Sequence, residues 1–470
     1  MHKESVNRSV GSFGKKEVTA TVTRPRAKNC HHHLLVLFFA AIFLIFPIFF
    51  GNSYCKGVLL FFGVACAFTL AVRMCLFLVG IFLHKPGNYK AYDFDDGARE
   101  WPIYTILLPL YKEKKETIAN LLFSMKNLSY PPHRIDLKVL VHEGDGETID
   151  AVNSLKNSHI PFETIEVPRG DVRSKPNTCN FGLKRAKGKY LTIYDAEDMP
   201  EKYQLKKAVR AFESLPKEYV SVQAALNYYN SKENFLTKCF SVEYSMWYDF
   251  TLRTISKLKL FFPLGGNSNH FKTKILRNLG GWDAYNVTED ADLGVVIGRN
   301  EYKMAFLESI TEEEAPTTLK AWIKQRVRWM KGFMLTFCGH FANPLKLYEN
   351  LGLGNFIIFL VFVLFSFLSF LSVPFLYALV LMLYLCGDGS WHSFLFNNWM
   401  AVSSVLIVGI YWIVIAKNKV KGIFWNSFLF PFYWIFHSAA SLIALLEITT
   451  KPFYWDKTEH GLSKFIKNHR

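Results

Sequence analysis

The chain has 470 residues, of which half are hydrophobic and 43 are phenylalanine, and its formal charge is +16. This composition is too apolar for an ordinary soluble enzyme of this length, and it leaves room for a core-bearing domain beside several membrane spans. The basic excess alone would suit a nucleic-acid partner. The positions of the lysines and arginines disfavour one, because these residues flank apolar runs, as they do beside anionic lipid headgroups. The eight cysteines show no spacing typical of a zinc site or a disulfide framework.

The N-terminal part predicts a tail followed by a membrane hairpin. Residues 1–33 are polar and carry seven Lys or Arg, which indicates a disordered cytoplasmic tail. Two long apolar runs, Leu34–Phe50 and Gly57–Leu83, predict two spans; a cleaved signal peptide is the alternative, but the basic stretch is too long for one. The basic tail places the N-terminus, and so the domain after the hairpin, in the cytoplasm. Arg73, the one charge in the second run, faces a polar conduit or reaches an interface.

From His84 to about Ser231, short apolar runs alternate with amphipathic segments. The expected strands are 103–109, 137–142, 162–167, 190–194 and 219–226. The expected helices are 114–127, 147–157, 176–187 and 201–213. This alternation predicts a parallel sheet with helices on both faces and ligands at the carboxyl ends of the strands.

The later part mixes aromatic and basic residues and then becomes strongly apolar. Phe235–Phe262 and Thr318–Tyr348 predict helices that lie in the membrane interface. Three apolar stretches follow, at Asn355–Cys386, Met400–Ala416 and Ile423–Leu446. The basic loop after the second stretch and the basic C-terminal tail both favour the cytoplasm. One of the two Pro-interrupted stretches is therefore expected to be re-entrant, interfacial or a tight pair, and the number of spans stays open.

Two acidic clusters suit chemistry on a nucleotide sugar. Tyr194-Asp195-Ala196-Glu197-Asp198 follows an apolar run, so its acids come at the carboxyl end of a strand, where Mg²⁺ or Mn²⁺ binds few carboxylates together with phosphate oxygens. The same acids would equally suit the start of the next helix. Thr288-Glu289-Asp290 supplies a carboxylate that can take a proton from an attacking hydroxyl, although these three residues alone also fit an exposed helix start.

A third cluster, Gln325-Arg326-Val327-Arg328-Trp329, combines a cation with an aromatic ring. On a helix, Gln325, Arg328 and Trp329 share one face. Trp can stack on a sugar ring, and Arg can neutralise a diphosphate. An amphipathic interfacial helix would contain the same residue types.

In this order the three clusters resemble the signature of processive family-2 glycosyltransferases, such as the cellulose, chitin and hyaluronan synthases. The likeness covers roughly residues 100–335. It implies an α/β fold of the GT-A type, a Rossmann-like mixed sheet with flanking transmembrane and interfacial helices. It also implies that Asp290 is the general base beside Glu289, and that Asp195 binds the metal. Glu197 stands where that family usually has Asp, so either Glu197 or Asp198 is the second metal ligand.

The resemblance also assigns residues to the substrates. The expected binding residues are Tyr111, Glu113 and Asp145 for the base and ribose, Lys175 for the phosphates, Asn269 and His270 for the acceptor sugar, and Gln325, Arg328 and Trp329. Near the C-terminus, Trp455-Asp456-Lys457-Thr458-Glu459-His460-Gly461 resembles a segment of membrane relatives of these synthases. Lys457 and His460 would then close over the nucleotide, although the string equally suits an aromatic–basic belt beside the membrane.

The expected organisation assigns each part of the chain to one role. The parts are a tail (1–33), a transmembrane hairpin (34–83), a cytoplasmic GT-A domain (84–317), interfacial helices (318–350), a transmembrane region (351–450) and a basic C-terminal segment (451–470).

The expected activity is inverting hexosyl transfer from a nucleotide-diphosphate sugar, a UDP-sugar by resemblance, with Mg²⁺ or Mn²⁺. It would extend a β-linked polysaccharide at the bacterial inner membrane. The expected partners are the donor, a growing glycan or lipid acceptor, the bilayer, and export or regulatory proteins, without nucleic acid. Two alternatives stay open: transfer of one sugar to a polyprenyl-phosphate lipid, and a nucleotide-binding receptor or regulator without turnover.

Overall fold

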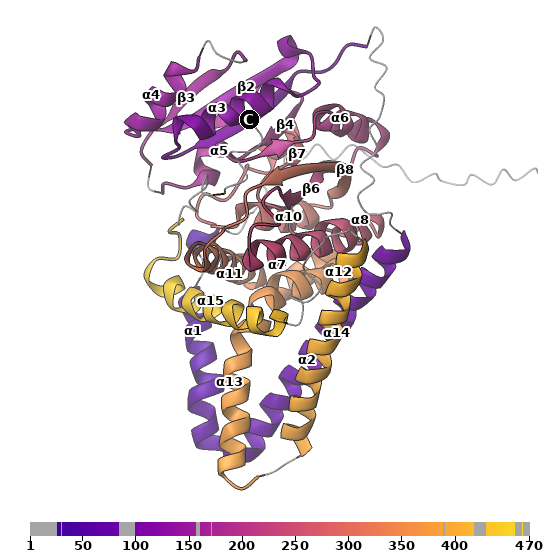
Figure 1. Cartoon of the computed structure of the whole chain (residues 1–470). Helices are drawn as coiled ribbons and strands as arrows, with labels where there is room; N and C mark the ends of the chain where they lie inside the picture. Colours follow the sequence, from indigo (N-terminus) through magenta and orange to yellow (C-terminus); the bar gives the residue numbers. More distant parts are fainter. Residues whose placement is uncertain are drawn as a thin grey trace, which may run out of the picture.

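A computed structural model describes residues 26–29, 31–83, 99–156, 160–170, 172–388, 391–417, 429–455 and 463. Most of the expected tail therefore lies outside the described residues. In Figure 1 the sheet and its helices form the upper part of the molecule, and long helices extend below it.

The sheet has eight strands in the order β3-β2-β1-β4-β7-β6-β8-β5. The strands are β1 (Tyr104–Leu110), β2 (Ile135–His142), β3 (Glu163–Val167), β4 (Tyr190–Ile193), β5 (Met199–Pro200), β6 (Tyr219–Tyr228), β7 (Asn269–Lys272) and β8 (Lys303–Glu313). All five strands expected from the apolar runs are present. The expectation of a parallel sheet is wrong, because β7 lies antiparallel between β4 and β6; the mixed sheet implied by the family resemblance is confirmed.

The three unexpected strands lack the apolar signal on which the sequence analysis relied. β7 is four residues long and mostly polar, and β5 is a two-residue edge. β8 ends in an acidic run, Glu312-Glu313-Glu314, but pairs in parallel with β6 along most of its length. Long-range pairing, rather than local pattern, makes these segments strands.

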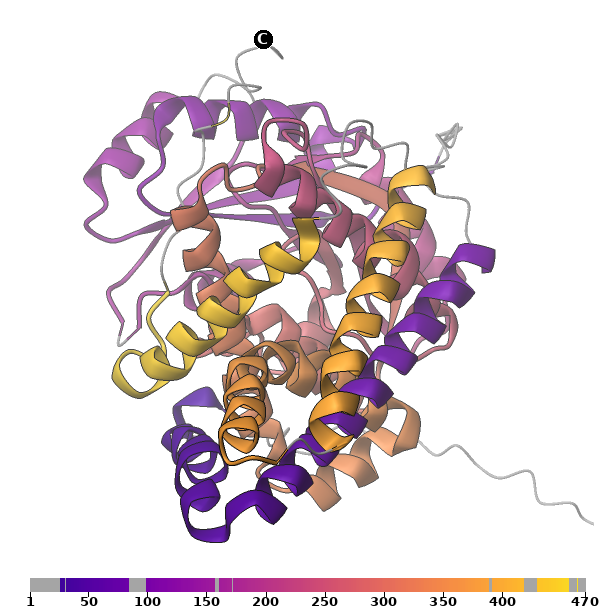
Figure 2. The same cartoon turned by 60° about the horizontal axis from the view of Figure 1, so that its bottom comes forward.

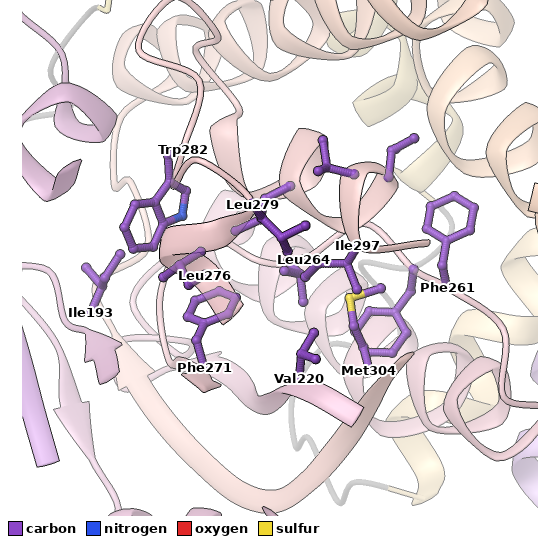
Figure 3. Close-up of a cluster of buried hydrophobic side chains, with 14 of the residues drawn as sticks. Ile193, Val220, Phe261, Leu264, Phe271, Leu276, Leu279, Trp282, Ile297 and Met304 are labelled. Atoms are coloured by element: carbon purple, nitrogen blue, oxygen red, sulfur yellow. The ribbon is translucent and has the colours of Figure 1, made fainter. Parts of the chain in front are cut away.

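Helices cover both faces of the sheet and enclose two cores. The helices that flank the strands are α3 (Lys115–Lys126), α4 (Gly146–Ser154), α5 (Lys175–Arg185), α6 (Gln204–Ser214), α9 (Thr273–Asn278) and α10 (Glu289–Arg299). One core lies between the sheet and the helices nearer the membrane-type segments, and Figure 3 shows part of it, with Phe271 and Trp282 facing Leu276 and Leu279. The Phe271 and Trp282 rings meet edge to face at 5.8 Å.

Long helices connect this domain to the lower part of the molecule. The first two are α1 (His33–Ala40), with the π-turn Ala41–Ile45, and α2 (Phe46–Leu83), which reverses at Gly51 where φ is 63°. Only a residue without Cβ adopts this backbone readily, and the turn makes the two expected apolar runs a hairpin. In the middle of the chain, α7 (Phe235–Tyr244), the π-turn η4 (Ser245–Leu252) and α8 (Arg253–Lys257) are continuous, and α11 (Leu319–Phe341) follows later.

The C-terminal helices complete the bundle. They are α12 (Pro344–Phe359), the π-turn η5 (Leu360–Leu364), α13 (Phe365–Leu385), α14 (Trp391–Lys417) and α15 (Phe430–Thr450). α2 packs against α13 and α14, as Figure 2 shows. Among the described residues, three helical stretches are long and apolar enough to cross a membrane: His33–Leu83, Pro344–Leu385 and Phe432–Thr450. In Figure 1, however, α15 lies across α1 and α13 and packs along α11, the orientation expected of an interfacial helix.

We predict that Phe271→Ala lowers the midpoint of thermal unfolding by roughly 10 °C, because a large cavity in this core costs about 3–5 kcal/mol. Phe271 is 1% exposed, whereas Phe123 on α3 is 56% exposed, so Phe123→Ala serves as the matched control and should leave the midpoint nearly unchanged. Tryptophan fluorescence during heating measures both. Equal midpoints for the two variants would contradict the assignment of Phe271 to the core.

Candidate active site

A lysine at the start of α5 meets the first carboxylate after β4. Ser174 caps α5 by accepting a hydrogen bond from the Asn177 backbone, which places Lys175 at the first helical position. Its Nζ lies 2.6 and 2.7 Å from the two carboxylate oxygens of Asp195 and 2.7 Å from the Gly266 carbonyl. Burial disfavours the charge, but the carboxylates of Asp195, Glu289 and Asp290 outweigh burial and raise the pKa of Lys175.

Further carboxylates surround this pair. Glu197 and Glu313 line the same cavity as Asp195. Burial and the carboxylates of Asp195 and Glu113 raise the pKa of Glu197, and burial with the carboxylates of Glu197 and Asp195 raises the pKa of Glu313 to about 8. The region is therefore short of positive charge, even with Lys175 in place.

The second acid pair begins α10. Trp282 Nε1 donates to Asp290 Oδ1 at 2.8 Å, which fixes the orientation of the carboxylate. Burial and the adjacent Glu289 carboxylate raise the pKa of Asp290, so this group gains proton affinity where a general base needs it. Glu289 is also buried, and burial raises its pKa despite the opposing effect of Lys175.

α11 carries the Gln/Arg/Trp cluster to the same cavity. Gln325, Arg328 and Trp329 all line it, and the Gln325 Oε1 atom is buried with no hydrogen-bond partner in the structure. Burial lowers the pKa of Arg328, although the carboxylates of Glu289 and Asp195 favour its charge. The Arg328 guanidinium lies 5.4 Å from the centre of the Trp455 ring, which also lines the cavity.

Arg326, from the same cluster, anchors α11. Its guanidinium forms an ion pair with Glu243 of α7 and lies 4.7 Å from the centre of the Trp329 ring. Tyr433 of α15 donates to the same Glu243 carboxylate at 3.0 Å. Burial opposes ionisation, but Arg326 lowers the pKa of Glu243 to about 2, so the pair stays charged.

These residues surround one cavity of about 880 Å³ that runs from the carboxyl edge of the sheet into the helical bundle. Its domain part is lined by ten of the residues that the sequence analysis assigned to the site: Tyr111, Glu113, Lys175, Asp195, Glu197, Glu289, Asp290, Gln325, Arg328 and Trp329. Its far part is lined by residues of α2, α13, α14 and α15. Segments more than 200 residues apart in the chain thus build a single site.

Four predicted site residues, Asp145, Asp198, Asn269 and His270, do not line this cavity. Asp198 is 1% exposed and accepts hydrogen bonds from the Asp195 backbone and from Asn267 Nδ2, at 2.8 and 2.7 Å. His270 is fully buried against the Tyr104 hydroxyl, and Asn269 Nδ2 donates to the Gly265 carbonyl. Asp145 accepts from the Lys112 backbone. Each contact supports a cavity-lining segment; Lys457 and His460 lie outside the described residues.

Two residues escaped the sequence analysis as site residues in their own right. Glu313 is the last residue of β8. A carboxylate at the end of a strand indicates a site residue, but Lys303–Glu313 was not predicted to be a strand. Trp282 lies before the Thr-Glu-Asp cluster and has no motif of its own. A buried tryptophan whose ring nitrogen needs an acceptor is the signal that would have suggested a carboxylate partner.

The residues of the site fit a divalent cation that the protein would bind together with the phosphate groups of a substrate. Within the described residues, no three His, Cys, Asp or Glu side chains already form a metal-binding group. Mg²⁺ and Mn²⁺ need few protein carboxylates when a substrate supplies phosphate oxygens, and Asp195 and Glu197 offer them. Burial and then neighbouring carboxylates raise the pKa values of Glu197 and Glu313, and an added cation would offset the repulsion among these acids.

The known proteins to which this chain is similar are named as glycosyltransferases or polysaccharide synthases. Residues 190–387 match the family model described as "Glycosyl transferase family group 2". The probable glycosyltransferase YdaM of Bacillus subtilis is 26% identical over 296 residues, which cover 59% of this chain and 68% of that protein. The poly-beta-1,6-N-acetyl-D-glucosamine synthase of Staphylococcus epidermidis is 23% identical over 352 residues, which cover 72% of this chain and 82% of the synthase. The chain spans about half the length of the Arabidopsis thaliana glucomannan 4-beta-mannosyltransferases that it also matches.

A solved structure supports the fold. The mannosyltransferase PcManGT of Pyrobaculum calidifontis, in complex with GDP-Man and Mn²⁺, superposes with a TM-score of 0.53 at 17% identity. The match covers 83% of this chain and 99% of that one. The mixed sheet with its covering helices is therefore a GT-A fold, as the family resemblance implied.

We predict that Gly332→Ala reduces turnover at least tenfold while leaving nucleotide binding nearly unchanged. A Cβ at Gly332 on α11 would lie 2.2 Å from Thr288 Oγ1, so Thr288 and the two acids after it must shift. A displacement near 1 Å at a reacting group costs about 10²-fold in rate. Steady-state kinetics and nucleotide titration measure the two effects.

The matched control is Gly63→Ala on α2, where nothing lies within 4 Å of the added Cβ. Its turnover should equal that of the unaltered protein. Normal turnover in Gly332→Ala would show that the α10–α11 contact does not position the acids.

Proposed function

Because this chain carries a family-2 glycosyltransferase domain of the processive-synthase type, we propose that it is an inverting membrane enzyme that extends a β-linked polysaccharide from a nucleotide-diphosphate sugar. The observation that carries the proposal is the single cavity in which Asp195, Asp290 and Arg328 meet and which continues among the membrane-type helices. A UDP-sugar is the proposed donor. The bacterial inner membrane, with the GT-A domain in the cytoplasm, is the proposed location.

The proposed reaction needs a base opposite the leaving diphosphate. Asp290, oriented by Trp282 and with a raised pKa, takes the proton of the acceptor hydroxyl as that oxygen attacks the anomeric carbon. The glycosidic bond to the diphosphate breaks in the same step, and the configuration inverts. No covalent sugar–enzyme intermediate is required.

Two cations and an aromatic ring position the substrates. Lys175 and Arg328 line the cavity and offer positive charge to the diphosphate, and Trp329 offers a face on which the acceptor sugar stacks. Asp195 and Glu197 would hold Mg²⁺ or Mn²⁺. When bound, the ion offsets the negative charge that develops on the departing diphosphate. The presence of GDP-Man and Mn²⁺ in PcManGT supports testing both ions and both classes of donor.

The far part of the cavity supports polymer extension over single transfer. Ser366, Ser369, Tyr411 and Trp434 line it among the long helices. Hydroxyl and aromatic side chains suit a passing glycan, so export of the product belongs to the proposal.

We predict that Asp290→Asn abolishes product formation, with a loss of about 10²- to 10⁴-fold in turnover, while nucleotide affinity stays within about twofold. Purified protein in lipid nanodiscs is supplied with radiolabelled UDP- and GDP-sugars, and the products are resolved by size. A ladder from one donor, absent in Asp290→Asn, is the expected result. One sugar on each lipid would favour transfer to a polyprenyl phosphate, and nucleotide binding without product from any donor would favour a receptor.

We also predict that removing divalent metal with EDTA abolishes transfer and that Mn²⁺ or Mg²⁺ restores it. Asp195→Asn should raise the metal concentration needed for half-maximal activity more than Glu197→Gln does. Asp195 forms an ion pair with Lys175, so its loss also leaves the positive charge of Lys175 unneutralised beside the metal. Asp136→Asn, a carboxylate outside the cavity that pairs with Lys138, is the control and should leave the metal dependence unchanged. Full activity in EDTA would exclude the proposed ion.

A further inference from the structure

The far part of the cavity contains a cation without an acidic partner. Arg73 of α2 lines it, and its Nη2 donates to the Val361 carbonyl of η5 at 2.8 Å. The guanidinium lies 5.2 Å from the centre of the Phe362 ring, and its buried Nε has no hydrogen-bond partner within the described part of the chain. Among the residues that the structure describes, no carboxylate forms an ion pair with Arg73.

Two hydroxyl groups that line the cavity have no hydrogen-bond partner among the residues that the structure describes. One is Thr69 Oγ1, whose residue is 4% exposed; Thr69 is one helical turn before Arg73, so both share a face of α2. The other is Ser403 Oγ on α14. Ser366 and Ser369, which also line the cavity, each donate to a backbone carbonyl four residues earlier. Thr69 and Ser403 therefore lack the hydrogen bond to the backbone carbonyl one turn earlier that Ser and Thr hydroxyl groups in helices often form.

The charge identifies the class of ligand. A guanidinium in a low-dielectric region is costly unless an anion accompanies it, and a neutral glycan would satisfy hydrogen bonds but not the charge. Phosphate oxygens accept hydrogen bonds from guanidinium and hydroxyl donors together. We infer that Arg73 and Thr69, which line this cavity from one face of α2, form a binding site for the phosphate group of a lipid.

The position of the site along α2 fits a headgroup. Arg73 lies ten residues before Leu83, the last residue of α2, or about 15 Å along the helix. Leu83 is at the domain end, where its carbonyl accepts a hydrogen bond from Lys257. Basic pockets between membrane helices on the cytoplasmic side bind anionic headgroups. The outward side chains of Phe61, Val64 and Phe68 on α2 offer apolar surface to the lipid chain.

The inference goes beyond the proposed transfer and is tested without turnover. Detergent-purified, delipidated full-length protein is titrated with undecaprenyl phosphate and with its uncharged analogue undecaprenol, and binding is followed by native mass spectrometry. A parallel pair, phosphatidylglycerol and diacylglycerol, distinguishes a lipid-linked acceptor from an ordinary bilayer lipid. The site predicts one saturable equivalent of a phosphate-bearing lipid, with its uncharged analogue bound at least tenfold more weakly.

Variants locate the binding. Arg73→Gln should weaken it by about 10- to 100-fold, the range for losing hydrogen bonds to a charged group. Thr69→Val should weaken it less. Lys56→Gln is the matched control, because Lys56 lies on the same helix, pairs with Asp388 at 2.6 Å and does not line the cavity.

Three results would overturn the inference. The first is equal binding of the phosphate-bearing and uncharged lipids, and the second is unchanged lipid binding in Arg73→Gln. The third is that Arg73→Gln weakens the binding of a neutral oligosaccharide but not the binding of lipid. If Arg73→Gln does not fold, two measurements still decide whether the inference holds. They are the comparison of charged with uncharged lipid on the unaltered protein and the lipid binding of Thr69→Val. Because the readout is lipid binding, failure here leaves the proposed transfer activity unaffected.

Discussion

A buried ion pair between Arg326 of α11 and Glu243 of α7 joins the helices on which the site depends. Tyr433 of α15 donates to the same carboxylate, so three helices meet at one charge. Removing one partner of such a pair leaves an uncompensated buried charge, at a cost of about 3–5 kcal/mol. α11 is therefore held in one position, and that position brings Arg328 and Trp329 to the cavity.

α11 also links the acids of the site to the C-terminal segment. Gly332 allows Thr288 to pack against the helix, which places the start of α10. Lys331 Nζ donates to Glu447 and to the Lys451 and Tyr454 carbonyls, which holds the chain after α15 beside α11. This contact brings Trp455 to Arg328. α11 thus contacts α10 of the sheet domain, α15 and the segment that follows α15.

The charge distribution explains why this site is suited to a phosphorylated substrate. Six carboxylates line the domain part of the cavity near Lys175 and Arg328: Glu113, Asp195, Glu197, Glu289, Asp290 and Glu313. Burial and neighbouring carboxylates raise the pKa values of Glu197, Asp290 and Glu313, so a nearby positive charge would favour their ionised forms. A metal–diphosphate complex brings the missing positive charge and uses the existing cations. Farther along the cavity lies Arg73, and no carboxylate of the described residues forms an ion pair with it.

Local pattern determined much of this protein. The apolar runs predicted five strands and the helical hairpin, since a buried strand or a spanning helix is encoded within its own residues. The acidic clusters and Gln325, Arg328 and Trp329 indicated the chemistry, because each motif lies within a few positions of the chain. Tertiary structure decided the rest. The antiparallel placement of β7 depends on its pairing with β4 and β6, and Asp198 and His270 do not line the cavity because packing, not residue type, sets exposure. The roles of Glu313, Trp282 and Arg73 likewise depend on neighbours distant in sequence, which no local pattern specifies.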